Sequence, residues 1–343
     1  MRHMLAAVAV LAMAAGLPAS AQEQAPDAAL TPAVIEPLAV RSLMLDLARA
    51  GGRIVAVGER GNVLYSLDEG RSWTQVQVPA SANLTAVYFV DERHGWAVGH
   101  DDVILRTEDA GDSWELVNFA PENNRPLLDV WFADENRGYA VGAYGAIYAS
   151  EDGGRSWKPV PFEPAPLGGE SAPPDPDDYY AEVDMGFDFH LNAIAPADDG
   201  ALYLAAEAGR LFRSDDSGAS WRELPSPYDG SFYGILPLDG SALLAFGLRG
   251  HVFHSGDGGQ TWSEPIPTGT TALLNSAIRP SSDLVIVAGL NGVMLVSRDG
   301  GRSFGFTQQD DRKSLAAVMW AGDGEAIVAG ETGLRRLAVP GLR

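Results

Sequence analysis

The sequence of 343 residues contains no cysteine and only two lysines, Lys158 and Lys313. Without cysteine, disulfides cannot hold the fold and no thiolate is available to bind a metal. Stability must therefore come from burial of apolar side chains, which a chain of this length can supply. After residue 21 there is no run of about 18 apolar residues, so we expect no membrane insertion of the mature chain. The formal net charge of −22 argues against nucleic acid or anionic lipid as a main partner.

The first 21 residues have the pattern of a secretory signal peptide. Arg2 precedes an apolar run over residues 5–17, and Ala19-Ser20-Ala21 forms a small-residue cleavage site. Because no cysteine follows the run, a lipoprotein anchor is excluded, and an uncleaved N-terminal anchor is the alternative interpretation. We therefore expect a secreted, periplasmic and monomeric protein, with a linker over residues 22–32 and a single domain over residues 33–343.

Six copies of one pattern, S/T-x-D-x-G-x-S/T-W/F, run through the chain. An aspartate at a turn accepts hydrogen bonds from nearby backbone N–H groups, and glycine adopts a positive φ without steric cost. Six similar copies favour a structural role over one catalytic or metal site. Successive copies start 41, 43, 64, 41 and 42 residues apart, so one interval carries an insertion of about 21 residues. The structural aspartates are Asp68, Asp109, Asp152, Asp216, Asp257 and Asp299.

Two further features repeat in step with this pattern. An apolar strand (A) is followed by a small-residue strand (B) that ends in a glycine-rich step, such as Val57-Gly58-Glu59-Arg60-Gly61. Strands C and D flank the aspartate pattern. The sequence therefore predicts an all-β fold, a seven-bladed β-propeller of four-stranded antiparallel blades. The seventh unit has three strands, so we expect residues 33–40 to add the missing outer strand and close the ring. The expected A strands are Leu43–Leu47, Leu84–Phe89, Leu127–Phe132, Leu191–Ala195, Tyr233–Leu236, Leu274–Ile278 and Leu315–Trp320.

The repeated aspartate pattern is the Asp-box of bacterial neuraminidase-type (BNR) repeats. With its A-V-G-x-x-G steps and the segment Asp152–Trp157 (D-G-G-R-S-W), the chain resembles the photosystem II stability/assembly-factor family of seven-bladed propellers over roughly residues 33–340. The resemblance implies a non-enzymatic scaffold or assembly factor for a membrane-protein complex. Some relatives outside photosynthetic organisms are encoded beside exporters of the resistance-nodulation-division type, so the family suggests a membrane transporter in the cell envelope as one candidate partner.

Propeller topology separates the loops into two faces. The B–C and D–A connections, with the glycine steps, lie on one face near the central channel, and the Asp-boxes lie on the other. Loops of such scaffolds often carry binding sites, and the glycine-step side chains are chemically varied, although solvated loop residues are the simpler interpretation of any single one. The predicted partner-binding residues on this face are Glu59, Arg60, His100, Asp101, Tyr144, Glu207, Arg249, Asn291 and Glu331.

The insertion, residues 163–190, joins the same face because it is a D–A connection. It holds eight acids and no Lys or Arg, opens Pro-rich and then turns aromatic. We predict that Asp177, Asp178, Tyr179 and Tyr180 take part in recognition, with the segment docked either on its own propeller or on a partner. Proline at positions 174 and 176 breaks the pattern of a calcium-binding loop, so no metal is expected there.

The alternative functions are an extracytoplasmic Asp-box glycoside hydrolase, sialidase- or endoglucanase-like, and a carbohydrate-binding module. Several arginines could reach the glycine-step face, but the F/Y-R-I-P entry of sialidases is missing around Arg41. No H-E-x-x-H or P-loop pattern occurs, and the histidines lack metal-ligand spacing. We therefore predict a protein that is not an enzyme, with no catalytic residues, no metal and no cofactor.

Overall fold

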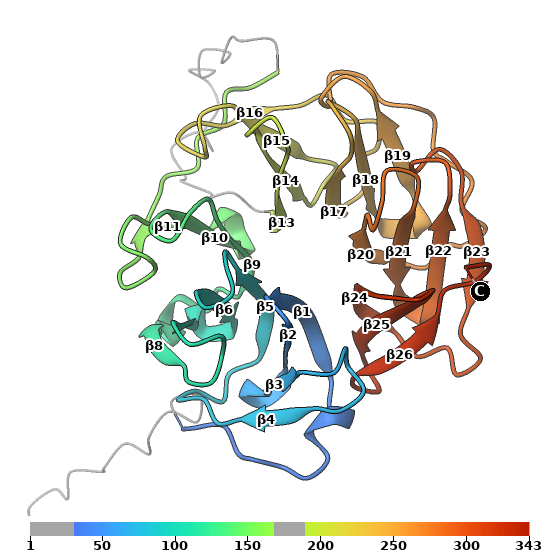
Figure 1. Ribbon diagram of the computed structural model, residues 1–343. Helices are drawn as coiled ribbons and strands as arrows, with labels where there is room; N and C mark the ends of the chain where they lie inside the picture. Colours follow the sequence, from blue (N-terminus) through green and yellow to red (C-terminus); the bar gives the residue numbers. More distant parts are fainter. Residues whose placement is uncertain (1–30, 168–188, 343) are drawn as a thin grey trace, which may run out of the picture.

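The computed structural model describes residues 31–167 and 189–342. Seven antiparallel sheets surround a central channel, which confirms the predicted seven-bladed β-propeller (Figure 1). The predicted signal peptide lies outside the described residues, as do almost all of the predicted linker and most of the insertion. In the part of the chain that the structure describes, no helix is long and apolar enough to cross a membrane.

Each blade begins with an inner strand at the channel and proceeds outward. The inner strands are β1 (Met44–Ala50), β5 (Leu84–Phe89), β9 (Leu127–Phe132), β13 (Leu191–Pro196), β17 (Phe232–Pro237), β20 (Leu274–Ile278) and β24 (Leu315–Gly322). The second strands are β2 (Arg53–Gly58), β6 (Gly95–Gly99), β10 (Gly138–Gly142), β14 (Leu202–Ala206), β18 (Leu243–Gly247), β21 (Val285–Gly289) and β25 (Glu325–Gly330).

The remaining elements lie toward the periphery or in turns. The third strands are β3 (Val63–Ser66), β7 (Ile104–Thr107), β11 (Ile147–Ser150), β15 (Leu211–Ser214), β19 (Val252–Ser255), β22 (Val293–Ser297) and β26 (Arg335–Ala338). The outer strands are β4 (Thr74–Val76), β8 (Glu115–Asn118), β12 (Lys158–Pro159), β16 (Arg222–Glu223) and β23 (Gly305–Gln308). The 3-10 turns are η2 (Ala39–Arg41), η3 (Glu59–Gly61), η4 (His100–Asp102), η5 (Pro121–Asn123), η6 (Ala143–Gly145), η7 (Leu248–Gly250) and η8 (Leu290–Gly292).

The core lies between neighbouring blades. Both faces of each second strand are covered, so β6, β14, β18 and β21 are buried along their whole length. Burial on both sides explains why these strands are continuous apolar runs instead of alternating ones. In the cluster between blades one and two, Val55 and Val57 of β2 pack with Leu84 and Phe89 of β5 and with the Asp-box residue Trp114.

All six Asp-boxes have the predicted turn geometry. In the first, Asp68 Oδ1 accepts hydrogen bonds from Ser72 N (2.8 Å) and Ser66 Oγ (2.8 Å), and Asp68 Oδ2 accepts one from Ser72 Oγ (2.6 Å). Ser66 Oγ in turn accepts from Gly70 N (2.8 Å). The aspartates at positions 109, 152, 216, 257 and 299 repeat these contacts. These shared contacts are the ones expected if the aspartates hold their turns.

Two blades have three strands instead of four. In blade five the segment after Trp262 runs beside β19 and donates Ser263 N to His254 O and Ile266 N to Val252 O, both at 2.8 Å. It does not form a regular strand because the prolines at positions 265 and 267 have no N–H to donate.

The prediction that residues 33–40 add the outer strand of blade seven is wrong. The segment runs along blade one instead, where Ala33 N donates to Val78 O (2.9 Å), and it ends in η2. Pro37 cannot donate to a ladder, which explains why the segment does not pair with β26. Packing of β1 against β24 closes the ring, together with a hydrogen bond from Leu334 N to Val40 O (3.0 Å).

Candidate functional site

The glycine steps form one repeated turn that presents a side chain to solvent. In six blades the second turn residue has a left-handed backbone, with φ between 53° and 60°. The first glycine of the step is required by close approach: a Cβ on Gly58 would lie 2.2 Å from the Leu43 carbonyl oxygen. Tyr144 is 51% exposed, and Arg249 and Asn291 are also exposed. The left-handed residues are Arg60, Asp101, Tyr144, Ala208, Arg249 and Asn291.

Three of the predicted binding acids also brace the fold. Glu59 accepts a hydrogen bond from Leu43 N (3.1 Å) through one carboxylate oxygen. Glu207 accepts in the same way from His190 N (3.0 Å), and Glu331 from the backbone N–H of residue 314 (2.8 Å). Each bond ties a glycine step to the start of the inner strand of its own blade. These glutamates therefore have a structural role, and their part in partner binding stays a prediction.

The channel is lined by one bulged residue from each inner strand. Every pairing between the inner and second strands skips one residue near its start, and the skipped side chain projects into a cavity of 440 Å³. A bulge re-aims a side chain in this way. The sequence analysis missed this set, because a bulge depends on the register with the neighbouring strand. The seven residues are Leu45, Thr85, Leu128, Asn192, Tyr233, Asn275 and Ala316.

Polar side chains of the channel wall connect neighbouring blades. Thr85 Oγ1 donates to the carbonyl oxygen of residue 127 (2.6 Å), and Asn192 Nδ2 donates to that of residue 232 (2.8 Å). Asn275 Nδ2 donates to that of residue 316 (2.8 Å). Asp46 Oδ2 accepts from Val87 N (2.8 Å). These bonds satisfy backbone groups at the innermost edge, where adjacent blades are closest.

Two channel carboxyl groups have pKa values raised well above their usual range. Burial raises the pKa of Asp46 to about 7, and the negative charge of Asp129 adds to the effect. Burial also raises the pKa of Asp129 to about 6, although its carboxylate accepts hydrogen bonds from Ile194 N (2.9 Å) and Val130 N (2.8 Å). Neither residue was singled out from the sequence, where the available signal is an acid inside an otherwise apolar strand.

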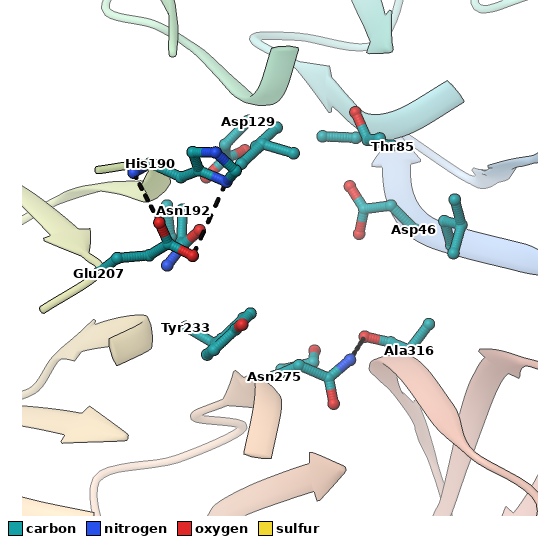
Figure 2. Close-up of a pocket in the computed structure, with 14 residues that line it drawn as sticks. Asp46, Thr85, Asp129, His190, Asn192, Glu207, Tyr233, Asn275 and Ala316 are labelled. Carbon is teal, nitrogen blue, oxygen red and sulfur yellow. Dashed lines mark hydrogen bonds and ion pairs between the residues drawn. The ribbon is translucent and has the colours of Figure 1, made fainter. Parts of the chain in front are cut away.

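Three side chains, Tyr144, His190 and Glu207, form a cluster at the mouth of the channel, and Figure 2 shows His190 beside Glu207. His190 Nδ1 lies 3.8 Å from Glu207 Oε1, and the ring of Tyr144 packs edge-to-face on His190 with centroids 5.1 Å apart. Figure 2 shows Tyr233 and Asn275 on one side of the cavity, with Asp46 and Thr85 on another. Of the predicted binding residues that the structure describes, Glu207 alone lines the cavity itself. Arg60, Arg249 and Asn291 lie farther out on the same face.

Both ends of the insertion are anchored on the propeller. The ring of Phe162 contacts Phe212 edge-to-face at 5.0 Å, and Phe189 stacks on Phe212 at 5.9 Å. Ala165 forms a parallel bridge with Arg222 of β16. The described ends therefore pack against blade four. The predicted recognition residues Asp177, Asp178, Tyr179 and Tyr180 lie outside the described residues.

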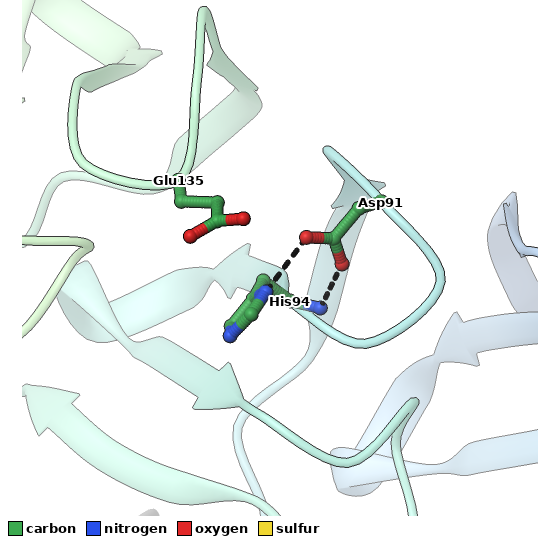
Figure 3. A group of neighbouring side chains, drawn as sticks. All are labelled: Asp91, His94 and Glu135. Atoms are coloured by element: carbon green, nitrogen blue, oxygen red, sulfur yellow. Dashed lines mark hydrogen bonds and ion pairs between the residues drawn. The ribbon is translucent and has the colours of Figure 1, made fainter.

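A second group of polar side chains lies on the Asp-box face (Figure 3). Asp91, His94 and Glu135 have potential ligand atoms within 4.8 Å of one another. Asp91 also holds its own turn, because its carboxylate accepts from His94 N (2.7 Å) and lies 2.7 Å from His94 Nδ1. In blade three, Asp134 and Arg137 make the corresponding contacts. A turn-stabilising pair therefore accounts for this group without a metal, and the absence of a metal stays a prediction.

The described channel wall lacks the arginine cluster of a sialidase-type centre. Such a centre needs three arginines on the substrate carboxylate, and no arginine is among the described residues that line the cavity. Asp46 and Asp129 could be considered as a carboxyl pair for glycoside hydrolysis. Each, however, uses its carboxylate to hold a backbone N–H of the next blade, so an architectural role accounts for both.

Seven blades, six Asp-boxes and a polar channel define the class: an Asp-box β-propeller. The family model described as "Photosynthesis system II assembly factor YCF48" matches residues 29–108, 66–125 and 110–263, which is more than half of the chain. The protein therefore belongs to the Ycf48 photosystem II assembly-factor family, as the resemblance indicated.

Individual relatives are similar over shorter stretches. Photosystem II assembly protein Ycf48 of Thermosynechococcus vestitus is 37% identical over 43 residues, 12% of either chain. The chloroplastic photosystem II stability/assembly factor HCF136 of Cyanidioschyzon merolae is 33% identical over 85 residues, 24% of this chain and 18% of the relative. These alignments thus span less than a fifth of either relative. A structure of "YCF48 bound to D1 peptide" superposes with a TM-score of 0.66 at 16% identity, covering 90% of this chain and 99% of the other, which shows the shared fold.

Proposed function

We propose that this protein is a non-catalytic assembly factor that binds a protein partner through its glycine-step face. The observation that carries this proposal is the repeated left-handed turn, which presents chemically different side chains around one channel mouth. If this turn served only the fold, we would expect little variation at its second residue, just as the Asp-boxes vary little from one blade to the next. Arg60, Tyr144, Arg249 and Asn291 instead offer two cations, an aromatic ring and an amide on one surface.

Membership of an assembly-factor family supports a protein partner. The related YCF48 structure contains a D1 peptide, so at least one propeller of this fold binds a peptide. For this chain we propose a partner in the cell envelope, with an exporter of the resistance-nodulation-division type as the specific candidate. The signal-peptide pattern of residues 1–21 supports export to the periplasm. The alternative, a glycoside hydrolase or carbohydrate-binding module, has less support because the channel wall carboxylates hold the fold together.

A pull-down with matched variants tests this proposal. Tyr144→Ala combined with Arg249→Glu changes the glycine-step face, whereas Arg155→Glu changes an exposed position on the Asp-box face of blade three. We expect detergent-solubilised envelope to yield a membrane-protein partner with the wild type and with Arg155→Glu, and much less of it with the double variant. Equal recovery with all three proteins would refute the assignment of the binding face. Loss with Arg155→Glu alone would move the site to the Asp-box face.

A further inference from the structure

The channel cavity holds carboxyl groups that no lysine or arginine among the described residues neutralises. Its wall includes three carboxyl groups, Asp46, Asp129 and Glu207, and one imidazole, His190. Among the described residues that line it, there is neither a lysine nor an arginine. Elsewhere in the molecule arginines pair with acids, as Arg53 does with Asp112 and Arg336 with Glu325. The channel is therefore a place where a positive charge from outside would find uncompensated partners.

The hydrogen bonds that the channel acids already accept do not satisfy this charge. Asp46 accepts from Val87 N, and Asp129 from Ile194 N and Val130 N. Backbone N–H groups carry only partial positive charge, and both acids keep a pKa well above 3.8 because burial penalises their ionised forms. A cation within about 4–6 Å would favour ionisation of these carboxyl groups and would be bound in return.

The shape of the site favours an organic cation over a metal ion. The channel acids do not belong to the group of described His, Asp and Glu residues whose ligand atoms lie within 4.8 Å of one another. The described channel residues therefore do not form a cluster of three such ligands, the minimum number of protein ligands in catalytic zinc sites. A cavity of 440 Å³ has the size of a small-ligand pocket. It also offers the ring of Tyr233, whose face can attract an ammonium or guanidinium group.

We propose that the channel mouth binds the ammonium of a lysine or the guanidinium of an arginine carried by an extended segment of the partner. This inference rests on the proposed function and adds the chemistry of the segment. Asp46 and Asp129 supply charge on the wall, Glu207 supplies it at the rim, and Tyr233 and the amides of Asn192 and Asn275 supply polar and aromatic contacts. The net charge of −22 assists the approach of a basic segment at long range.

Nuclear magnetic resonance titration with single-residue probes tests the inference. The probes are N-acetyl-lysine methylamide, N-acetyl-arginine methylamide and, as a neutral control of similar shape, N-acetyl-norleucine methylamide. The side-chain amide signals of Asn192 and Asn275 report on the channel directly. We expect a cationic probe to shift both signals with a Kd of about 1–10 mM, and norleucine to leave them in place. Added salt should weaken the cationic probe.

Charge variants complete the test. Asp46→Asn with Asp129→Asn removes both charges. The substitution at position 46 keeps the acceptor for Val87 N, whereas asparagine at position 129 keeps an oxygen for only one of Ile194 N and Val130 N, so the melting temperature checks that the double variant still folds. This double variant should bind the cationic probe at least about fivefold more weakly, whereas Glu135→Gln, exposed on the opposite face, should bind it like the wild type. Equal shifts with norleucine, absence of shifts up to about 50 mM, or unchanged affinity in the double variant would each overturn the inference.

The pull-down separates this inference from the proposed function. The pull-down is repeated with the Asp46→Asn/Asp129→Asn variant. If this variant recovers the partner fully while the Tyr144→Ala/Arg249→Glu variant does not, the cation site is wrong and the binding face stands. If the wild type recovers no partner but the channel still binds lysine or arginine selectively, the proposed function is wrong and the cation site stands.

Discussion

Replacing Asp46 by asparagine should stabilise the folded protein at pH 8 and stabilise it clearly less at pH 5. Asparagine keeps the oxygen that accepts the Val87 N–H bond, and it resembles the protonated carboxyl group in shape and charge. The pKa of Asp46 is raised by burial from 3.8 to about 7. The folded state therefore binds this proton more tightly than the unfolded state does.

The sign of the effect follows from proton linkage. Between about pH 4 and 7 the folded protein holds more protons than the unfolded chain, so its stability falls as the pH rises through this window. Each pKa unit corresponds to about 1.4 kcal/mol, which gives a limit of about 4 kcal/mol for the full shift. Asp46 is only partly buried and faces the channel, so we expect about 2 kcal/mol at pH 8.

Chemical denaturation at pH 5 and pH 8, followed by tryptophan fluorescence, measures this difference. The control is Glu135→Gln, which removes an exposed acid and should change stability little at either pH. A destabilisation by Asp46→Asn at pH 8 would refute the reasoning, because it would show that the ionised carboxylate stabilises the fold. An equal stabilisation at both pH values would show that proton binding is not the cause.

Three further predictions concern the repeat and the insertion. Trp114→Ala should destabilise the protein by about 3–5 kcal/mol in denaturant titrations, because Trp114 is only 8% exposed in the core between blades one and two. Trp262 is half-buried, so Trp262→Ala should cost clearly less. Equal losses would contradict the packing. Hydrogen bonds from Ser156 lower the pKa of Asp152 to about 2, so its contribution to folding stability is present above about pH 4 and lost as the pH falls toward 2. Asp152→Asn should therefore reduce the loss of stability between pH 4 and pH 2 in unfolding curves. An unchanged loss in this range would argue against the assignment. Deleting residues 168–188 should leave the propeller folded in circular dichroism but weaken partner binding, and unfolding would identify the segment as a brace.

The sequence predicted the repeated parts of this molecule well and its irregular parts less well. The Asp-box of Asp68 forms a turn held by its own side chains, and the step at Gly58 is required by a close backbone approach. Both features depend on local sequence, so their spacing was enough to predict seven blades. The channel residues depend on a bulge in each inner strand, which local sequence does not specify. Asp46 and Asp129 each follow the bulged residue of their strand, and the repeat alone gave no reason to single out an acid there. The prediction of a closing strand failed because face-to-face packing of blades one and seven closes the ring without an added strand. Pro37 also disfavours strand pairing of this segment.

Site-specific photo-crosslinking in living cells tests the central claim most directly. A photoreactive phenylalanine derivative at position 144 places the label on the glycine-step face, and the same label at position 155 places it on the Asp-box face of the same blade. If the glycine-step face binds an envelope protein, position 144 should yield an adduct with a membrane protein, and position 155 should not. An adduct from position 155 with none from position 144 would contradict the account.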